Sequence, residues 1–151
     1  MHSGRYDVKY SYRALERVGL RPTTARVTVL GYFLEHPEAH VSAERLFSLI
    51  SDGPEPVSMA TLYRSLGQLQ DGGLISSFSL SGGRSIYELN RGTAHDHRVC
   101  TKCGRIDELS DSGIDMRVAQ IADSADFSVV ERHLVLLGVC RDCKSGRSQQ
   151  G

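Results

Sequence analysis

The sequence predicts an α+β fold in two domains, an N-terminal winged-helix domain over residues 1–90 and a small C-terminal α/β domain over residues 95–143. Two observations predict this division. Helical patterns followed by a β-hairpin pattern fill the first part, and strand patterns around one helix fill the second. The polar stretch 91–94 is the expected hinge, and residues 144–151, with few apolar side chains, are the expected disordered tail.

Four helices are expected in the first domain, because apolar residues recur there at helical spacing and glycine or proline ends each run. The expected ranges are 10–18, 24–36, 42–52 and 58–70. The expected N-caps of the last three are Thr23 or Thr24, Ser42 and Ser58. The third helix is expected to bury Leu46, Phe47, Leu49 and Ile50, and the fourth Leu62, Leu66 and Leu69.

Residues 74–81 and 84–90 alternate apolar and polar side chains around Gly82-Gly83, which is typical of a β-hairpin. Helices followed by a hairpin are typical of a winged helix, although a small α+β domain without a DNA role can have the same order. The fourth helix favours DNA binding, because residues 57–70 contain no Asp or Glu to repel phosphate. Its non-core face carries small, hydrogen-bonding and cationic side chains suited to a major groove: Ser58, Ala60, Thr61, Tyr63, Arg64 and Gln68.

The second domain is expected to contain strands over residues 95–100, 105–110 and 129–140, and a helix within 112–127. The helix carries apolar residues spaced for burial: Ile114, Val118 and Ile121. The dense apolar stretch 134–139 suits a sheet buried in a subunit interface, and therefore predicts dimerisation through this domain.

All four cysteines of the chain lie in this second domain, as two Cys-x-x-Cys pairs: Cys100 with Cys103, and Cys140 with Cys143. Cytosolic thiols are kept reduced, so such pairs indicate metal thiolates rather than disulfides. Unconnected buried or redox thiols are the alternative. Four sulfurs close a tetrahedral site and leave no position for substrate, so the pattern predicts a structural Zn(2+).

A second group of candidate metal ligands surrounds the hinge. His95 and His97 stand two residues apart on an expected strand, which places both imidazoles on one face. Further ligands are available from both domains: His40, Glu88 and Glu108. Mixed nitrogen and oxygen ligands suit Fe(II), Mn(II), Co(II) or Zn(II). Bound by both domains, a metal would select one domain orientation.

Composition excludes a generally basic surface, since 18 Lys and Arg balance 18 Asp and Glu. No apolar run of about eighteen residues occurs, and the first residues lack the apolar core of a signal peptide. We therefore expect a cytoplasmic protein that does not bind a membrane. No small-molecule substrate other than a metal ion is expected.

These segments together resemble the ferric uptake regulator (Fur) superfamily of metal-dependent transcription repressors. The resemblance covers residues 10–143, in the family's order: GLRPTTARVTVLGYF, HVSAERLF, SMATLYRSLGQLQDGGLI, GGRSIYEL, HDHRVCTKCGRIDEL and LGVCRDC. It implies a homodimer joined through the C-terminal domains, a palindromic double-stranded DNA operator near metal-uptake genes, and a sensor metal as corepressor.

The resemblance also implies roles for individual residues. Tyr63 and Arg64 would be the recognition-helix contacts, with Ser58 and Thr61 on the same surface, and Arg21 and Arg26 would contact the DNA backbone or minor groove. The structural zinc ligands would be Cys100, Cys103, Cys140 and Cys143. The regulatory metal ligands would be His40, Glu88, His95, His97 and Glu108.

Departures from the family pattern indicate which metal sites and which type of sensor to expect. Many iron-type members have histidines where this chain has Ala94 and Arg132, so no third metal site is expected between these positions. All four cysteines belong to the expected zinc site, which argues against a zinc sensor. Glu88, Glu108 and Arg64 stand where peroxide sensors tend to have other residues. The sequence therefore favours an iron-type repressor using Fe(2+) or Mn(2+), with Zn(2+) as a surrogate.

Several alternatives stay open at this stage. Within the family, the chain could sense peroxide, manganese or zinc. From another class, the His/Glu group could hold an open catalytic ion, but no motif supplies a general base or a substrate pocket, so no enzyme is expected. A zinc-ribbon interaction module without DNA binding would leave the acid-free helix unexplained.

Overall fold

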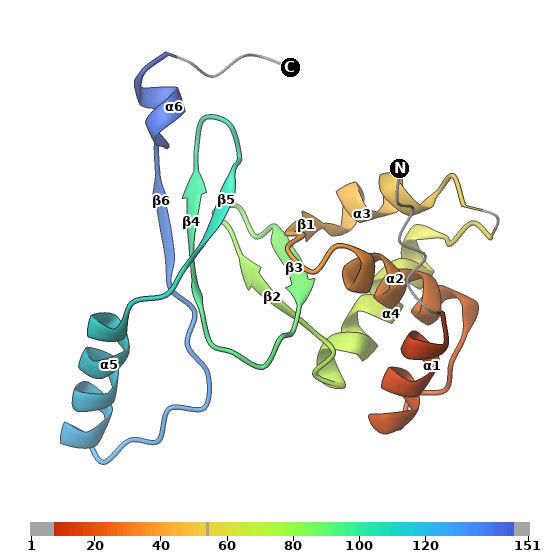
Figure 1. The fold of residues 1–151 in the computed structure, drawn as a ribbon, viewed down its shortest axis with the longest axis horizontal. Helices are drawn as coiled ribbons and strands as arrows, with labels where there is room; N and C mark the ends of the chain where they lie inside the picture. Colours follow the sequence, from red (N-terminus) through yellow and green to blue (C-terminus); the bar gives the residue numbers. More distant parts are fainter. Residues whose placement is uncertain (1–7, 54, 147–151) are drawn as a thin grey trace. The chain divides into compact units, whose positions relative to one another are not determined.

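The computed structural model describes residues 8–53 and 55–146. They divide into two compact units that meet between Arg91 and Gly92 (Figure 1). The expected hinge, 91–94, includes this point, and its role as a hinge stays a prediction.

The first unit contains four helices and three short strands. These are α1 (Val8–Arg17), α2 (Thr24–Glu35), β1 (Val41–Ser42), α3 (Ala43–Ile50), α4 (Met59–Asp71), β2 (Ile75–Ser79) and β3 (Ser85–Leu89). The expected N-caps are confirmed, because the hydroxyls of Thr23, Ser42 and Ser58 each accept a hydrogen bond from the backbone N–H three residues later.

The core of this unit lies between α2, α3 and α4. Leu62, Leu66 and Leu69 of α4 are fully buried, as the sequence predicts. The prediction for α3 is partly wrong, since Leu49 is 41% exposed. The buried residues of α3, Ala43, Leu46 and Ile50, follow helical i, i+3, i+7 spacing, and Leu49 falls beside that stripe.

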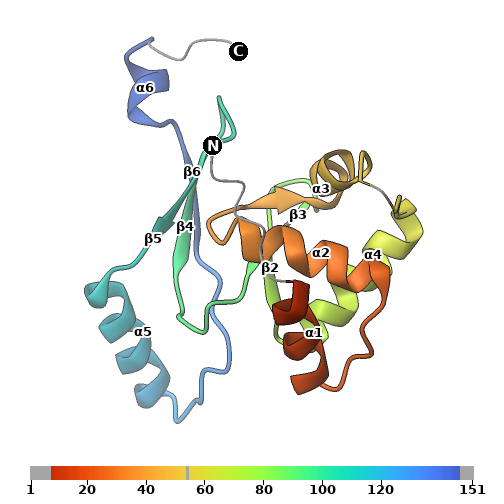
Figure 2. The same cartoon turned by 45° about the vertical axis from the view of Figure 1, so that its right-hand side comes forward.

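An antiparallel sheet with strand order β1-β3-β2 completes the unit (Figure 2). The hairpin predicted around Gly82-Gly83 is confirmed, with Phe78 opposite Ile86. Both glycines have positive φ, 86° and 78°, a backbone conformation that other residues rarely adopt. Four helices followed by this hairpin form the predicted winged-helix arrangement.

The second unit contains β4 (Asp96–Cys100), β5 (Ile106–Leu109), α5 (Ser112–Ser124), β6 (Val135–Gly138) and α6 (Arg141–Lys144). The strand order is β5-β4-β6, with β4 antiparallel to β5 and parallel to β6. The tail prediction is wrong at Lys144, which ends α6, and residues 147–151 of that tail lie outside the described residues.

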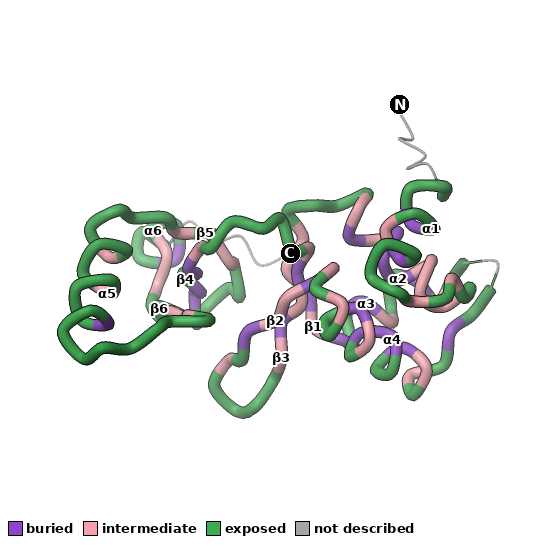
Figure 3. Tube along the Cα trace, turned by 90° about the horizontal axis from the view of Figure 1, so that it is seen from below, coloured by how far each residue is buried: buried purple, intermediate pink, exposed green. Residues whose placement is uncertain are grey.

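Much of the second unit is exposed (Figure 3), and several of its exposed residues are apolar. The predicted burial of α5 is wrong for Ile121, which is 54% exposed, while Ile114 and Val118 are half-buried. Leu136 and Leu137 of β6 are 46% and 50% exposed. In the described part of the chain, no helix is both long enough and apolar enough to cross a membrane.

Candidate metal centres and nucleic-acid interface

The four cysteines form one cluster in the second unit. Cys100 ends β4, Cys103 lies in the turn before β5, Cys140 precedes α6 and Cys143 lies within it. All four sulfur atoms lie within 4.8 Å of one another, and Cys103 Sγ lies 3.8 Å from Cys140 Sγ. Sulfurs at about 2.3 Å from a tetrahedral zinc are themselves about 3.8 Å apart. The cluster therefore fits a four-thiolate zinc site.

Backbone N–H groups favour the thiolate form of Cys100. The N–H of Cys140 donates to Cys100 Sγ at 3.3 Å. This hydrogen bond and that from the Cys103 N–H lower the pKa of Cys100 from 9.0 to about 6. A thiolate is the form that binds metal, so these N–H groups prepare the site.

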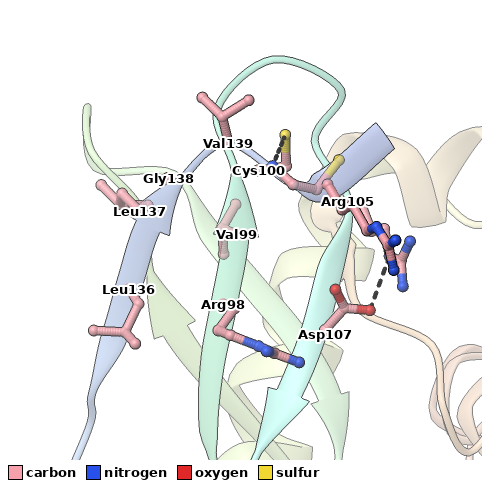
Figure 4. Close-up of a pocket in the computed structure, with 11 residues that line it drawn as sticks. Arg98, Val99, Cys100, Arg105, Asp107, Leu136, Leu137, Gly138 and Val139 are labelled. Atoms are coloured by element: carbon pink, nitrogen blue, oxygen red, sulfur yellow. Dashed lines mark hydrogen bonds and ion pairs between the residues drawn. The ribbon is translucent and has the colours of Figure 1, made fainter. Parts of the chain in front are cut away.

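A hollow of about 390 Å³ adjoins the cysteine cluster on the sheet (Figure 4). Leu136, Leu137 and Val139 line one side of it, and Arg105 lies on the other. Arg105 Nε donates to Asp107 Oδ1 at 2.9 Å, and Arg105 Nη1 lies 3.5 Å from Asp142 Oδ2 of α6. The arginine thereby connects β5 to the helix that carries Cys143.

Three of the predicted regulatory ligands come together in the second unit. The pairing of β4 with β5 places His97 directly opposite Glu108. The rings of His95 and His97 have centroids 4.9 Å apart, and His95 Nε2 lies 4.0 Å from Glu108 Oε1. His95 Nδ1 lies 3.0 Å from the Thr93 carbonyl oxygen, which can only accept. In the neutral imidazole Nδ1 therefore carries the proton, which makes Nε2 the nitrogen that would bind a metal.

The other two predicted ligands come together in the first unit. Val41 of β1 pairs with Tyr87 of β3, so His40 lies beside Glu88. His40 Nε2 is 2.8 Å from Glu88 Oε2, and both side chains are 8% exposed. Ser76 Oγ donates to Glu88 Oε1 at 3.1 Å. A buried carboxylate is thus held next to an imidazole, and the joining of the two ligand groups into one site stays a prediction.

Arg132, where the sequence predicts no third metal site, binds two carboxylates. Its guanidinium donates to both oxygens of Asp96, at 3.2 and 2.8 Å, and its Nη2 also donates to Asp115 Oδ1 at 2.8 Å. The sequence indicates the charges but not the contact, because Arg132 and Asp96 are 36 residues apart.

The exposed face of α4 carries the predicted DNA contacts. Tyr63, 47% exposed, and Arg64 lie on this face. The Ser58 hydroxyl caps α4 and donates to Thr61 Oγ1 at 2.9 Å. The helix extends one residue further than predicted, to Asp71. Its last residue is therefore an acid, and the acid-free stretch ends at Gln70.

The sequence does not indicate Glu44, whose carboxylate lies next to this face. Tyr63 Oη donates to Glu44 Oε1 at 2.7 Å. This hydrogen bond lowers the pKa of Glu44 and raises the pKa of Tyr63. The α4 surface is therefore free of acids from Met59 to Gln70, but one carboxylate from α3 reaches its tyrosine.

Arg26 and Arg21 lie at the start of α2. Arg26 Nε donates to Gln68 Oε1 of α4 at 2.9 Å, and its Nη1 donates to the Arg21 carbonyl oxygen at 2.6 Å. Arg26 is half-buried and Arg21 exposed. Arg26 thus connects α2 to the exposed helix, and a DNA contact by either arginine stays a prediction.

Comparison with known proteins places these features in a family. A sequence model described as the ferric uptake regulator family matches residues 17–137. The ferric uptake regulation protein of Legionella pneumophila is 38% identical over 130 residues, which cover 86% of this chain and 96% of that protein.

Solved structures agree. A ferric uptake regulator of Francisella tularensis, solved with iron, has a TM-score of 0.76 at 32% identity and covers 83% of this chain and 96% of its own. That of Pseudomonas aeruginosa, solved with manganese, has a TM-score of 0.73 at 32% identity over 87% and 98%. The chain therefore belongs to the ferric uptake regulator family.

Proposed function

We propose that the protein is a metal-responsive, DNA-binding transcriptional repressor that acts as a homodimer on a palindromic operator. The observation that carries this proposal is the convergence of His95, His97 and Glu108: the two imidazole rings have centroids 4.9 Å apart, and His95 Nε2 lies 4.0 Å from Glu108 Oε1. Ligands of this type suit a divalent first-row metal.

Cys100, Cys103, Cys140 and Cys143 would hold a structural zinc. The sulfur spacing fits a tetrahedral ion, and four ligands leave no open position for substrate. The site connects the turn after β4 to α6, residues some forty positions apart. Its binding energy is therefore folding energy for the second unit.

His40, Glu88, His95, His97 and Glu108 would hold the regulatory metal. Each unit supplies part of the set, and within each unit the members already lie together. An ion bound by all five would stabilise only domain orientations in which both groups meet. The metal would thereby select the DNA-binding orientation by its differential affinity.

The exposed face of α4 would read DNA. Tyr63 and Arg64 would contact base edges, while Ser58, Thr61, Arg21 and Arg26 would position the domain on phosphates or in the minor groove. The exposed apolar residues of β6 support a dimer, because a second copy of the chain would bury them. A dimer would present two copies of the reading helix, one for each half of a palindromic operator.

Iron or manganese is the proposed corepressor, since the chain resembles regulators solved with each of these metals. Zinc could act as a surrogate, and a peroxide, manganese or zinc sensor is the alternative within the family. The family is one of regulators, and a catalytic use of the His/Glu group is the alternative that we do not favour. A cytoplasmic location is part of the proposal.

The test is fluorescence anisotropy of the zinc-loaded protein on a palindromic operator, with and without Fe(II) or Mn(II). We expect tight binding only with added metal. Equal operator binding with and without metal would contradict the proposed metal response. No operator binding under any condition would contradict the proposed DNA-binding role.

A further inference from the structure

The guanidinium of Arg132 connects three segments of the second unit. It binds both oxygens of Asp96 in β4, and through Nη2 it binds Asp115 in the first turn of α5. Arg132 itself lies in the segment that leads from α5 into β6. One side chain therefore joins a strand, a helix and the segment between them.

This contact differs from an ordinary surface ion pair. Asp96 is 1% exposed, and the Arg132 side chain is 21% exposed. A buried carboxylate is costly unless it is paired, and a two-pronged arginine contact satisfies both of its oxygens. Asp115 is 61% exposed, so the α5 arm of the contact is the weaker one.

Asp96 lies between the two histidines of the candidate sensor site. Neighbouring side chains of a strand point to opposite faces, so Asp96 anchors the strand from the face opposite to His95 and His97. The N–H of His97 also donates to the Leu134 carbonyl oxygen at 3.0 Å, two residues after Arg132. The same segment thus holds β4 through its backbone and through the Arg132 side chain.

We propose that Arg132 is a positioning residue for the sensor metal: its guanidinium acts as a fixed cation that links Asp96 of β4 to Asp115 of α5 and so sets the imidazoles of His95 and His97. This inference rests on the proposed function. Because the guanidinium already binds Asp96 and Asp115, these two carboxylates take up no further ion. Each chain then binds one structural zinc and one sensor metal.

The test is a Co(II) titration of the full-length, zinc-loaded protein, followed by the Co(II) absorption bands. Groups that orient metal ligands typically change metal affinity by about 10- to 100-fold when they are replaced. We expect Arg132→Met to weaken Co(II) binding by roughly that factor and to alter the band positions, while zinc content is unchanged. Arg132→Lys, which keeps the charge but cannot bind both oxygens, should fall between Arg132→Met and the parent.

The matched control is Arg117→Met, which removes an α5 arginine that donates a 3.4 Å hydrogen bond to Gln120 of the same helix. It should bind Co(II) like the parent. If Arg132→Met alone does not fold because Asp96 is left unpaired, the Asp96→Asn/Arg132→Met double variant leaves no buried charge and should show the same weakened binding.

The outcomes separate the two proposals. A parent protein that binds no Co(II) beyond its zinc site contradicts the proposed function. A parent that binds one Co(II), with unchanged affinity and bands in folded Arg132→Met or in the double variant, overturns the role of Arg132. If neither variant folds, Arg132 serves stability alone, and its proposed role in positioning the metal ligands is also overturned.

Discussion

The hydroxyl of Tyr63 on α4 donates a 2.7 Å hydrogen bond to the carboxylate of Glu44 at the start of α3. This bond joins the exposed helix to its neighbour and fixes the tyrosine in the DNA-free protein. It also places a negative charge beside a surface proposed to meet phosphate. DNA binding must therefore either keep this pair as a unit or separate it.

The Tyr63–Glu44 bond makes stability depend on pH. The pKa of Glu44 is lowered in the folded state, so its contribution is present above the unfolded pKa and is lost as pH falls through the folded value. The pKa of Tyr63 is raised by the same bond. We expect Glu44→Gln to be less stable than the parent at neutral pH, with the difference vanishing in acid.

Denaturant unfolding of both proteins across that pH range, together with a spectroscopic titration of the tyrosines, measures this. Tyr63→Phe, which removes the donor, is the control and should lose the same pH dependence. A Glu44→Gln difference that stays constant from acid to neutral pH would contradict the assignment.

Arg64 is the exposed cation on the proposed reading face. Arg64→Ala should lose roughly 1–3 kcal/mol of operator binding if the side chain reads a base edge, and should relax preference at one position per half-site. A phosphate contact would instead weaken binding to all sequences evenly and reduce the salt dependence. Anisotropy on an operator series decides between them, with Arg117→Ala in the second unit as the control. Parental affinity in Arg64→Ala would exclude α4 as the reader.

Backbone N–H groups lower the pKa of the Cys100 thiol to about 6 and so favour its thiolate. Cys100→Ser should lose zinc together with the fold of the second unit and the dimer, because zinc binding supplies on the order of ten kcal/mol of folding energy. Lys102→Ala, an exposed residue of the same turn, should keep all three. Elemental analysis and circular dichroism measure this, and a folded, zinc-free Cys100→Ser dimer would refute it.

Leu137 of β6 is 50% exposed on the apolar surface that we assign to the dimer. Leu137→Asp places a charge on that proposed interface and should shift the protein to monomers in analytical ultracentrifugation, because charged residues are depleted in interface cores. Val130→Asp is the control, since Val130 is 97% exposed and lies outside the strands. A Leu137→Asp dimer as stable as the parent would place the interface elsewhere.

Features set by local sequence are the ones that could be predicted. The N-caps at Ser42 and Ser58 depend on one side chain and an N–H three residues away, and the Gly82-Gly83 turn depends on backbone freedom. The cysteine cluster follows from ligand chemistry and spacing alone. The sequence does not predict the two-residue strand β1, since this strand is defined only by its pairing with β3.

Contacts between distant segments that follow no metal-ligand pattern could not be predicted. Tyr63 and Glu44 are 19 residues apart, and Arg132 and Asp96 are 36 apart, so tertiary placement decides these pairs. The error at Ile121 has another cause. Its spacing marks an apolar face correctly, but this chain by itself does not cover that face.

The proposed function requires His95 to belong to a metal site that controls DNA binding. The decisive measurement is operator affinity as a function of Fe(II) or Mn(II) concentration for the parent, His95→Ala and His133→Ala. His133 is an exposed histidine paired with Glu131 and lies outside the proposed site. For the parent and His133→Ala we expect metal to tighten operator binding about ten- to hundredfold, a coupling of roughly 1.4–2.8 kcal/mol. His95→Ala should keep its fold, dimer and zinc but bind the operator weakly at every metal concentration, whereas titration curves that superimpose on those of the parent would contradict the account.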